Sequence, residues 1–205
     1  MLRTIAQFAY VVPIMGMLFM LLYLVGGEDI IFFRRKKYEI DPKSDENLLK
    51  ALEKYSRTRD CKILGRTTLE FDGYTYTYDA IMVSYFGTIA FAAEPYAGDI
   101  YGELNEDQWL AIFQGDRKRI LNPLTAMNGT AKLFRDIYRA EGVKKYGQTE
   151  TMAVFTNKDS NVAVARNAAA CHVSNLAARL SEGKYITDNG TNIEEMVAAL
   201  AKYTK

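Results

Sequence analysis

Residues 5–27 form a run without a single charged side chain, IAQFAYVVPIMGMLFMLLYLVGG. A helix needs about 20 largely apolar residues to cross the hydrocarbon core of a bilayer, and this run is long enough. Pro13 and Gly16 are compatible with a membrane helix. Tyr10 and Tyr23 lie near the ends of the run, where aromatic rings favour the headgroup region. The run predicts one N-terminal transmembrane helix.

A cleaved signal peptide is the alternative interpretation of this run. It requires a basic start, a shorter apolar core and a small-residue cleavage site. Arg3 is the only basic residue before the run, and the VGGE at its end is a poor cleavage site. The RRKK cluster at 34–37 is typical of a stop-transfer signal. It predicts that residues 28–43 form a basic juxtamembrane linker that lies at anionic headgroups. The membrane anchor is therefore the interpretation that the sequence favours.

The distribution of basic residues predicts the orientation of the anchor. Four basic residues follow the apolar run closely, at 34–37, and one precedes it. Basic flanks stay on the cytoplasmic side of a membrane. We therefore expect a single-pass protein of the cell membrane with its N-terminus outside and its C-terminal domain in the cytoplasm.

Charge argues against strong binding of nucleic acid by the C-terminal domain. The whole chain has 26 basic and 25 acidic residues, of which five basic and two acidic ones precede residue 38. The remainder has 21 basic and 23 acidic residues and is slightly acidic. Domains that hold phosphate backbones are usually basic. DNA therefore remains a possible partner that charge does not favour, and a protein partner is expected in addition to the bilayer.

Cysteine and histidine are too scarce for a zinc site or a disulfide framework. The chain has two distant cysteines, Cys61 and Cys171, and one histidine, His172, whereas zinc needs about four ligands. Cys171, His172 and Ser174 are close in sequence, inside a segment that resembles a helix. Neighbours in a helix point to different sides, so we expect these side chains not to meet as a nucleophile and a base.

The pattern after residue 43 predicts an α/β domain over 44–205 with a mixed central sheet flanked by helices. A helix begins at Ser44, the expected N-cap, and strand-rich segments follow, with Asp72-Gly73 as a hairpin turn. Asn122 and Pro123 begin a second helix, which Gly142 ends. The expected order is helix, three strands, helix, strand, helix, helix. The expected segments are a helix at 44–56, strands at 61–71, 74–84 and 88–94, a strand or short helix at 106–113, a polar turn at 115–119, a helix at 122–142, a strand at 149–157, and helices at 168–183 and 191–204.

A series of short motifs in this domain resembles a known family. The order is DENLLKAL at 45–52, YDAIMVS at 78–84, GDIYG at 98–102, then Trp109, then NPLTAMNGTAKLFRDI at 122–137. In order and spacing, this series resembles the nuclease-related domain, a branch of the PD-(D/E)xK nuclease superfamily. The likeness extends over residues 44–140 and implies a restriction-endonuclease-like fold.

The resemblance also implies where the functional positions of the family fall. The helix glutamate falls on Glu46 and the metal-binding aspartate on Asp79. The Glu-x-Lys pair falls on Ala92 and Glu94, or, with the register moved by two, on Glu94 and Tyr96. Neither register contains a lysine. The asparagine and the glutamine of the family fall on Pro95 and Ala126.

These substitutions matter because of the chemistry of such a site. Carboxylates hold Mg²⁺ or Mn²⁺, the metal activates a water, and the lysine helps to position and deprotonate it. Here Asp79 and Glu94 remain as possible weak metal ligands, with Glu46 as a third catalytic carboxylate if the protein is active. We expect a catalytically inactive, membrane-anchored nuclease-like domain that acts in binding or scaffolding and needs no cofactor. The alternatives are a membrane-tethered metal-dependent DNA nuclease with an altered active site, and a structural subunit of a membrane complex.

Overall fold

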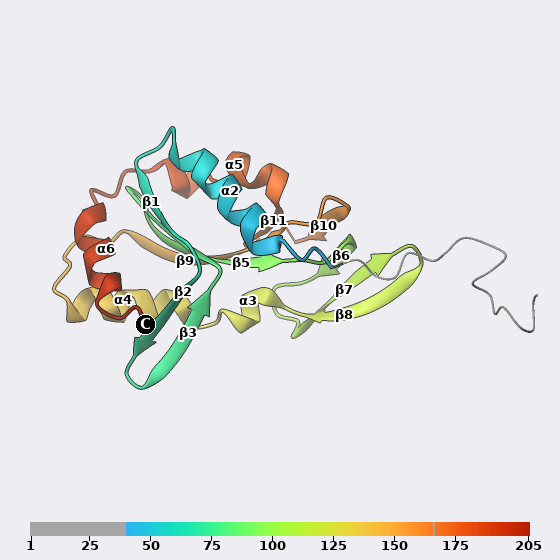
Figure 1. Ribbon diagram of the computed structural model, residues 1–205, viewed down its shortest axis with the longest axis horizontal. Coiled ribbons are helices and arrows are strands. Elements are labelled where there is room, and N and C mark those ends of the chain that lie inside the picture. The colour runs from blue at the N-terminus through green and yellow to red at the C-terminus, as the bar shows by residue number, and fades with distance from the viewer. Residues whose placement is uncertain (1–39, 166) are drawn as a thin grey trace, which may run out of the picture. The chain divides into compact units, whose positions relative to one another are not determined.

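The computed structural model describes residues 40–165 and 167–205, and these described residues belong to one compact unit (Figure 1). The membrane helix predicted over 5–27 lies outside the described residues, as does most of the basic linker. Within the described ranges, no helix is long and apolar enough to cross a bilayer. The anchor therefore remains a prediction from the sequence.

The centre of this unit is a five-stranded mixed sheet with the order β1-β4-β5-β9-β11. β1, β4 and β5 are antiparallel neighbours, whereas β9 runs parallel to β5 and β11 parallel to β9. β5 and β9 pair along eight residues each. The predicted mixed central sheet is confirmed. Its strands are β1 (Cys61–Leu64), β4 (Ala80–Ser84), β5 (Gly87–Glu94), β9 (Gln148–Phe155) and β11 (Ala170–His172).

Helices cover both faces of the central sheet, because its strands carry apolar side chains on both faces. α2 (Ser44–Ser56) and α5 (Leu176–Arg179) pack on one face, and α4 (Thr130–Ala140) and α6 (Ile193–Ala201) pack on the other (Figure 1). All five residues of β4 are buried, as expected for a strand between two helical layers. The prediction of helices flanking the sheet is therefore confirmed.

A second, four-stranded sheet has the order β10-β6-β7-β8 and its own apolar cluster. Trp109 is 1% exposed in this cluster and stacks on Phe155 of β9 at 6.3 Å between ring centroids. Its indole Nε1 donates a hydrogen bond of 2.9 Å to the carbonyl of Glu103. The tryptophan therefore joins the second sheet to the end of the first. The strands are β6 (Gly98–Gly102), β7 (Gln108–Phe113), β8 (Asp116–Leu121) and β10 (Ser160–Val164).

The segments expected as single strands at 61–71 and 74–84 each divide into two. β2 (Thr67–Phe71) and β3 (Tyr74–Tyr78) leave the central sheet and form a separate two-stranded ribbon. Asp72 and Gly73 connect them with φ angles of 53° and 79°, which confirms the predicted hairpin turn. The division places Asp79 at the point where the chain passes from the ribbon to the sheet.

Two expectations for residues 106–142 need correction. The polar turn predicted over 115–119 is instead the two-residue turn Gln114-Gly115, and the charged residues that follow form β8. The predicted helix is interrupted, because Gly129 takes a φ of 89° between α3 (Pro123–Ala126) and α4. Asn122 caps α3 through its side chain, as predicted, since its Oδ1 accepts a hydrogen bond of 2.9 Å from the N–H of Leu124.

The helix predicted over 168–183 is wrong. This segment begins with strand β11 and continues through the 3-10 turn η1 (Val173–Asn175) into the short helix α5, before η2 (Gly183–Ile186). The expected N-cap at Ser44 is also wrong: Lys43 holds that position, and Ser44 is buried at 2.6 Å from the hydroxyl of Thr156. In the segment at 168–183, the pairing of β11 with β9 outweighs the helix propensity of the alanines.

Candidate active site

Asp79 lies directly before β4, at the point where the chain passes from the two-stranded ribbon to the central sheet. Because Ala80 pairs with Phe91 in antiparallel register, Asp79 lies opposite Ala92 on β5. Its Oδ2 accepts a hydrogen bond of 2.8 Å from the N–H of Ala93. Burial raises the pKa of the Asp79 carboxyl, and this hydrogen bond opposes the rise. The side chain is thus held on the backbone of β5.

Glu94 ends β5 and shares its strand face with Ala92, because alternate residues of a strand point to the same side. Burial, and then the charge of Asp79, raise the pKa of the Glu94 carboxyl to about 7. The two carboxyl groups therefore interact, and Glu94 is partly protonated near neutral pH. Ala92 contributes only a methyl group to the same face.

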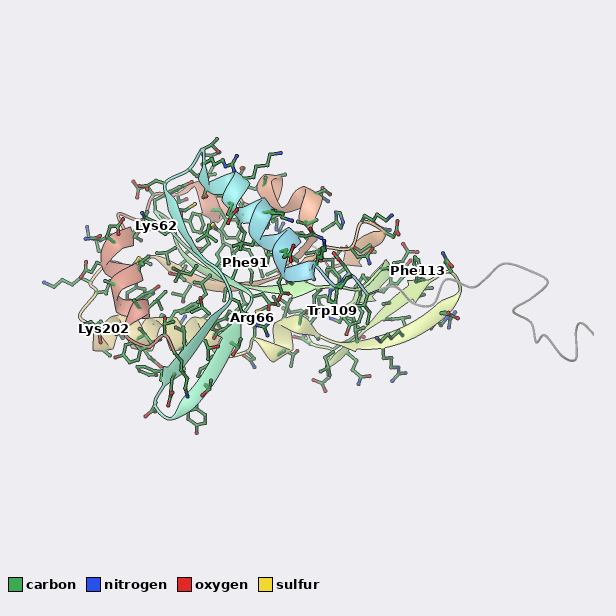
Figure 2. All side chains as sticks on the ribbon, viewed as in Figure 1. Lys62, Arg66, Phe91, Trp109, Phe113 and Lys202 are labelled. Atoms are coloured by element: carbon green, nitrogen blue, oxygen red, sulfur yellow. The ribbon has the colours of Figure 1, made fainter. Side chains whose placement is uncertain are left out.

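The first turn of α2 contributes Asp45, rather than Glu46, to the surroundings of Asp79. The side chain of Glu46 is 63% exposed and lies 3.6 Å from the ammonium group of Lys50. Asp45 accepts a hydrogen bond of 3.3 Å from the guanidinium group of Arg66, which comes from the turn between β1 and β2 (Figure 2). The charges of both members of this ion pair act on Asp79.

Tyr96 occupies the lysine position of the alternative register. The ammonium group of Lys118 on β8 lies 4.8 Å from the centroid of the Tyr96 ring. Burial and the charge of Glu94 raise the pKa of the Tyr96 hydroxyl. A basic group is thus present beside this ring, but it comes from another strand and makes a cation–π contact.

Asp79 and Glu94 are the residues at which the sequence predicts a weak site for Mg²⁺ or Mn²⁺. These hard cations take several oxygen ligands, and the described residues include no group of three or more Asp, Glu, His or Cys side chains placed to hold a metal ion. One oxygen of Asp79 is already bonded to Ala93. Glu94 must also lose a proton before it can serve as a ligand at neutral pH.

Cys171, His172 and Ser174 show a geometry that differs from expectation. The imidazole Nδ1 of His172 lies 2.7 Å from the hydroxyl of Ser174, so these two side chains do meet. The pair caps η1, since Nδ1 also accepts a hydrogen bond of 3.2 Å from the N–H of Ser174. Nε2 lies 3.1 Å from the carbonyl of Asn157. Burial raises the pKa of the Cys171 thiol to about 11, which keeps the thiol protonated and unreactive.

Arg66 and Asp45 are the site residues that the sequence did not reveal. Asp45 is adjacent to the chosen Glu46, and only the helix orientation distinguishes the two. Arg66 is 13 residues before Asp79 and belongs to no motif. The single signal in the sequence is Gly65, which precedes it and is compatible with a turn.

Comparison with known proteins supports the family resemblance. Comparison of the chain with curated proteins and with solved structures gives no match. The family model of the nuclease-related domain matches residues 43–156, which is more than half of the chain. The matched range contains α2, Asp79, β5 and the whole of β9. The chain therefore belongs to the nuclease-related domain family.

Proposed function

We propose that this protein is a membrane-anchored nuclease-like domain that has lost hydrolytic chemistry and acts in binding or scaffolding at the cytoplasmic face of the membrane. The observation that carries the proposal is the residue pair Ala92 and Glu94 at the Glu-x-Lys position, on the strand face beside Asp79. A methyl group replaces a ligand there, and a carboxyl group replaces an ammonium group.

The chemistry of phosphodiester hydrolysis explains why this pair matters. The reaction needs a cation to stabilise charge on the phosphate and a group that orients the attacking water. Glu94 cannot replace a lysine, because its carboxyl group carries no positive charge. Burial, and then the charge of Asp79, raise the pKa of this carboxyl to about 7. Asp79 and Glu94 would therefore repel both the phosphate and the nucleophile that the site must assemble.

Charge and the N-terminal sequence support a protein partner and a membrane location. The domain after residue 37 is slightly acidic, which disfavours tight binding to DNA. The apolar run at 5–27 and the basic cluster at 34–37 support a single-pass anchor with the domain in the cytoplasm. A scaffold role, or a role as a structural subunit of a membrane complex, agrees with these features.

A metal-dependent nuclease with an altered site is the second candidate. The pair Asp79 and Glu94 favours it, because the charge of Asp79, after burial, raises the pKa of the Glu94 carboxyl. In that case Glu94 is the catalytic glutamate, and Mg²⁺ or Mn²⁺ is the cofactor.

Restoring the family pattern tests the proposal. The double change Ala92→Glu and Glu94→Lys, made in the full chain in detergent, returns a ligand and a basic group to the face of Asp79. We expect the double variant to bind Mn²⁺ measurably by calorimetry and the wild type to show no saturable binding. Ala126→Gln is the control, because it restores a family residue on α3 without adding a charge. Saturable binding by the wild type, with the affinity of the double variant, would contradict the proposal.

A further inference from the structure

The second sheet, β10-β6-β7-β8 (Figure 1), has one covered face and one open face. The covered face carries Ile100, Trp109 and Ile120, which are 0%, 1% and 3% exposed in their apolar cluster. Neighbouring residues of a strand point to the opposite face. On that opposite face Tyr101 is 44% exposed and Leu121 is 72% exposed. Large apolar side chains of this sheet therefore lie in contact with solvent.

The strand register arranges the side chains of the open face in rows across the sheet. Tyr101 of β6 pairs with Leu110 of β7, which pairs with Arg119 of β8. In the next row, Ile112 of β7 pairs with Arg117 of β8. Paired residues point to the same side of a sheet. An apolar centre with a basic edge results, and we call it the outer face: Tyr101, Leu110, Ile112, Arg117, Arg119 and Leu121.

An acidic loop lies at one end of the outer face. The connection from β6 to β7 contributes Glu103, Glu106 and Asp107, all of them exposed. This loop and Arg117 line the same open hollow, whose volume of about 1250 Å³ exceeds the roughly 300–1,000 Å³ of a typical site for a small molecule. Arg117 lies four residues, or about 13 Å, from Leu121 at the loop end of β8. The two signs of charge thus occupy opposite ends of one surface.

The charge of Arg117 is available to a partner. The salt bridges between described residues do not include Arg117. Asp116 precedes it and points to the other face of the strand. Asp99 lies two strands away in the row of Ile112, and its Oδ1 accepts a hydrogen bond of 2.9 Å from Asn161. The outer face therefore remains positive at the Arg117 end.

We propose that the outer face is a dimer interface, which stacks on the outer face of a second copy of this chain. A two-fold axis across the strands reverses their direction, so the acidic loop of each copy faces Arg117 of the other. The apolar rows then pack on each other, as twisted sheets do in β-sandwiches. Arg119 lies nearer the axis, between the apolar centre and the acidic loop. This inference goes beyond the proposed function, because it does not depend on the chemistry at Asp79.

The size of the outer face predicts a weak dimer. Its four strands have five or six residues each, so the face spans about 20 by 20 Å, or about 400 Å². Stable interfaces bury about 800 Å² on each partner. The anchor predicted at 5–27 would confine both copies to one membrane, which raises their effective concentration. Association should therefore depend on concentration.

Exchange of the two charges tests the proposed arrangement. Sedimentation equilibrium of the full chain in density-matched detergent, over a series of concentrations, gives the dissociation constant of the dimer. Arg117→Glu places like charges opposite each other twice and should raise this constant at least about tenfold. Adding Asp107→Lys should recover most of the loss, because both signs are then exchanged. Asp107 bonds to the N–H of Asn122 through its backbone carbonyl, so the substitution leaves that bond in place.

The apolar centre is tested with a matched pair of tyrosines. Tyr101→Ser removes the ring from the outer face and should raise the dissociation constant at least about fivefold. Tyr74→Ser is the control, because Tyr74 is 66% exposed on β3 of the separate ribbon. Thermal unfolding followed by circular dichroism confirms that each variant is folded.

The outcomes separate this inference from its alternatives. A dimer that Arg117→Glu weakens and Asp107→Lys restores supports the interface, and so does a loss in Tyr101→Ser that Tyr74→Ser does not show. A wild type that is monomeric at every concentration overturns the interface. A dimer that none of these changes affects also overturns it, because the contact then lies elsewhere in the chain. No outcome depends on metal binding or DNA cleavage, so the proposed function is tested separately.

Discussion

Glu94 has the largest change in acidity among the carboxyl groups at the candidate site. Its pKa rises from 4.5 to about 7, first because of burial and then because of the charge of Asp79. The folded state therefore binds a proton that the unfolded state releases above pH 4.5. The stabilisation of the folded state by this proton is fully present below pH 4.5 and is lost as the pH rises through about 7. Glu94 thus makes the domain less stable at neutral pH than at pH 5.

The variant Glu94→Gln tests this assignment. The unfolding free energy of the wild type should fall between pH 5 and pH 8. In Glu94→Gln this fall should be smaller by up to about 3 kcal/mol. Urea unfolding of the full chain at the two pH values, followed by circular dichroism, measures the change. Glu46→Gln is the control, because that side chain is 63% exposed on α2. An unchanged pH dependence in Glu94→Gln would show that another group is responsible.

Strand periodicity was sufficient to predict some of the site and not the rest. Asp79 and Glu94 could be placed on one face because pairing across an antiparallel hairpin follows from the turn. Arg66 could not be placed, because its contact with Asp45 depends on how α2 packs against the sheet. The same packing decides whether Glu46 or Asp45 faces Asp79, because consecutive residues of a helix point about 100° apart.

At the scale of elements, Trp109 on β7 links the second sheet to the central one. It is 1% exposed and stacks on Phe155 of β9. Gly102 of β6 leaves space for the ring, since a Cβ there would lie 2.1 Å from Trp109 Cδ1. This side chain therefore packs the second sheet against the end of the central one, within the apolar cluster that the second sheet forms with Phe155.

Trp109→Ala should lower the unfolding free energy by about 3–5 kcal/mol, because it removes a large buried side chain and leaves a cavity. Chemical denaturation followed by circular dichroism gives the value, since the chain has one tryptophan and the variant loses its fluorescence. The neighbouring Gln108→Ala, on the exposed side of the same strand, should change it by less than about 0.5 kcal/mol. Equal effects of the two changes would contradict this packing.

The elements themselves were predictable where pattern and turn chemistry agree. Helix α2, strands β4, β5 and β9, and the Asp72-Gly73 hairpin follow from their sequences. The structure of the segment at 168–183 does not follow from its sequence. Its alanines favour a helix locally, whereas β9 offers an edge on which β11 pairs. Such an edge is a tertiary feature that a single sequence does not show.

At the scale of the whole molecule, we expect a single-pass protein with its domain in the cytoplasm. Basic residues at 34–37 follow the apolar run at 5–27, and positive flanks remain inside. In spheroplasts of a bacterial host, a tag after Lys205 should resist added protease and become sensitive after lysis. Changing residues 34–37 to glutamine should weaken this orientation. Digestion of the tag in intact spheroplasts would contradict the topology.

The most direct test of the central claim is a DNA cleavage assay on the full wild-type chain in detergent. The reaction is run with Mg²⁺ and then with Mn²⁺, and Asp79→Ala is the matched control because it removes the carboxylate that the fold holds against β5. We expect no metal-dependent cleavage above background and no difference between the two proteins. Robust Mg²⁺-dependent cleavage by the wild type that Asp79→Ala abolishes would contradict it and make Asp79 and Glu94 catalytic carboxylates.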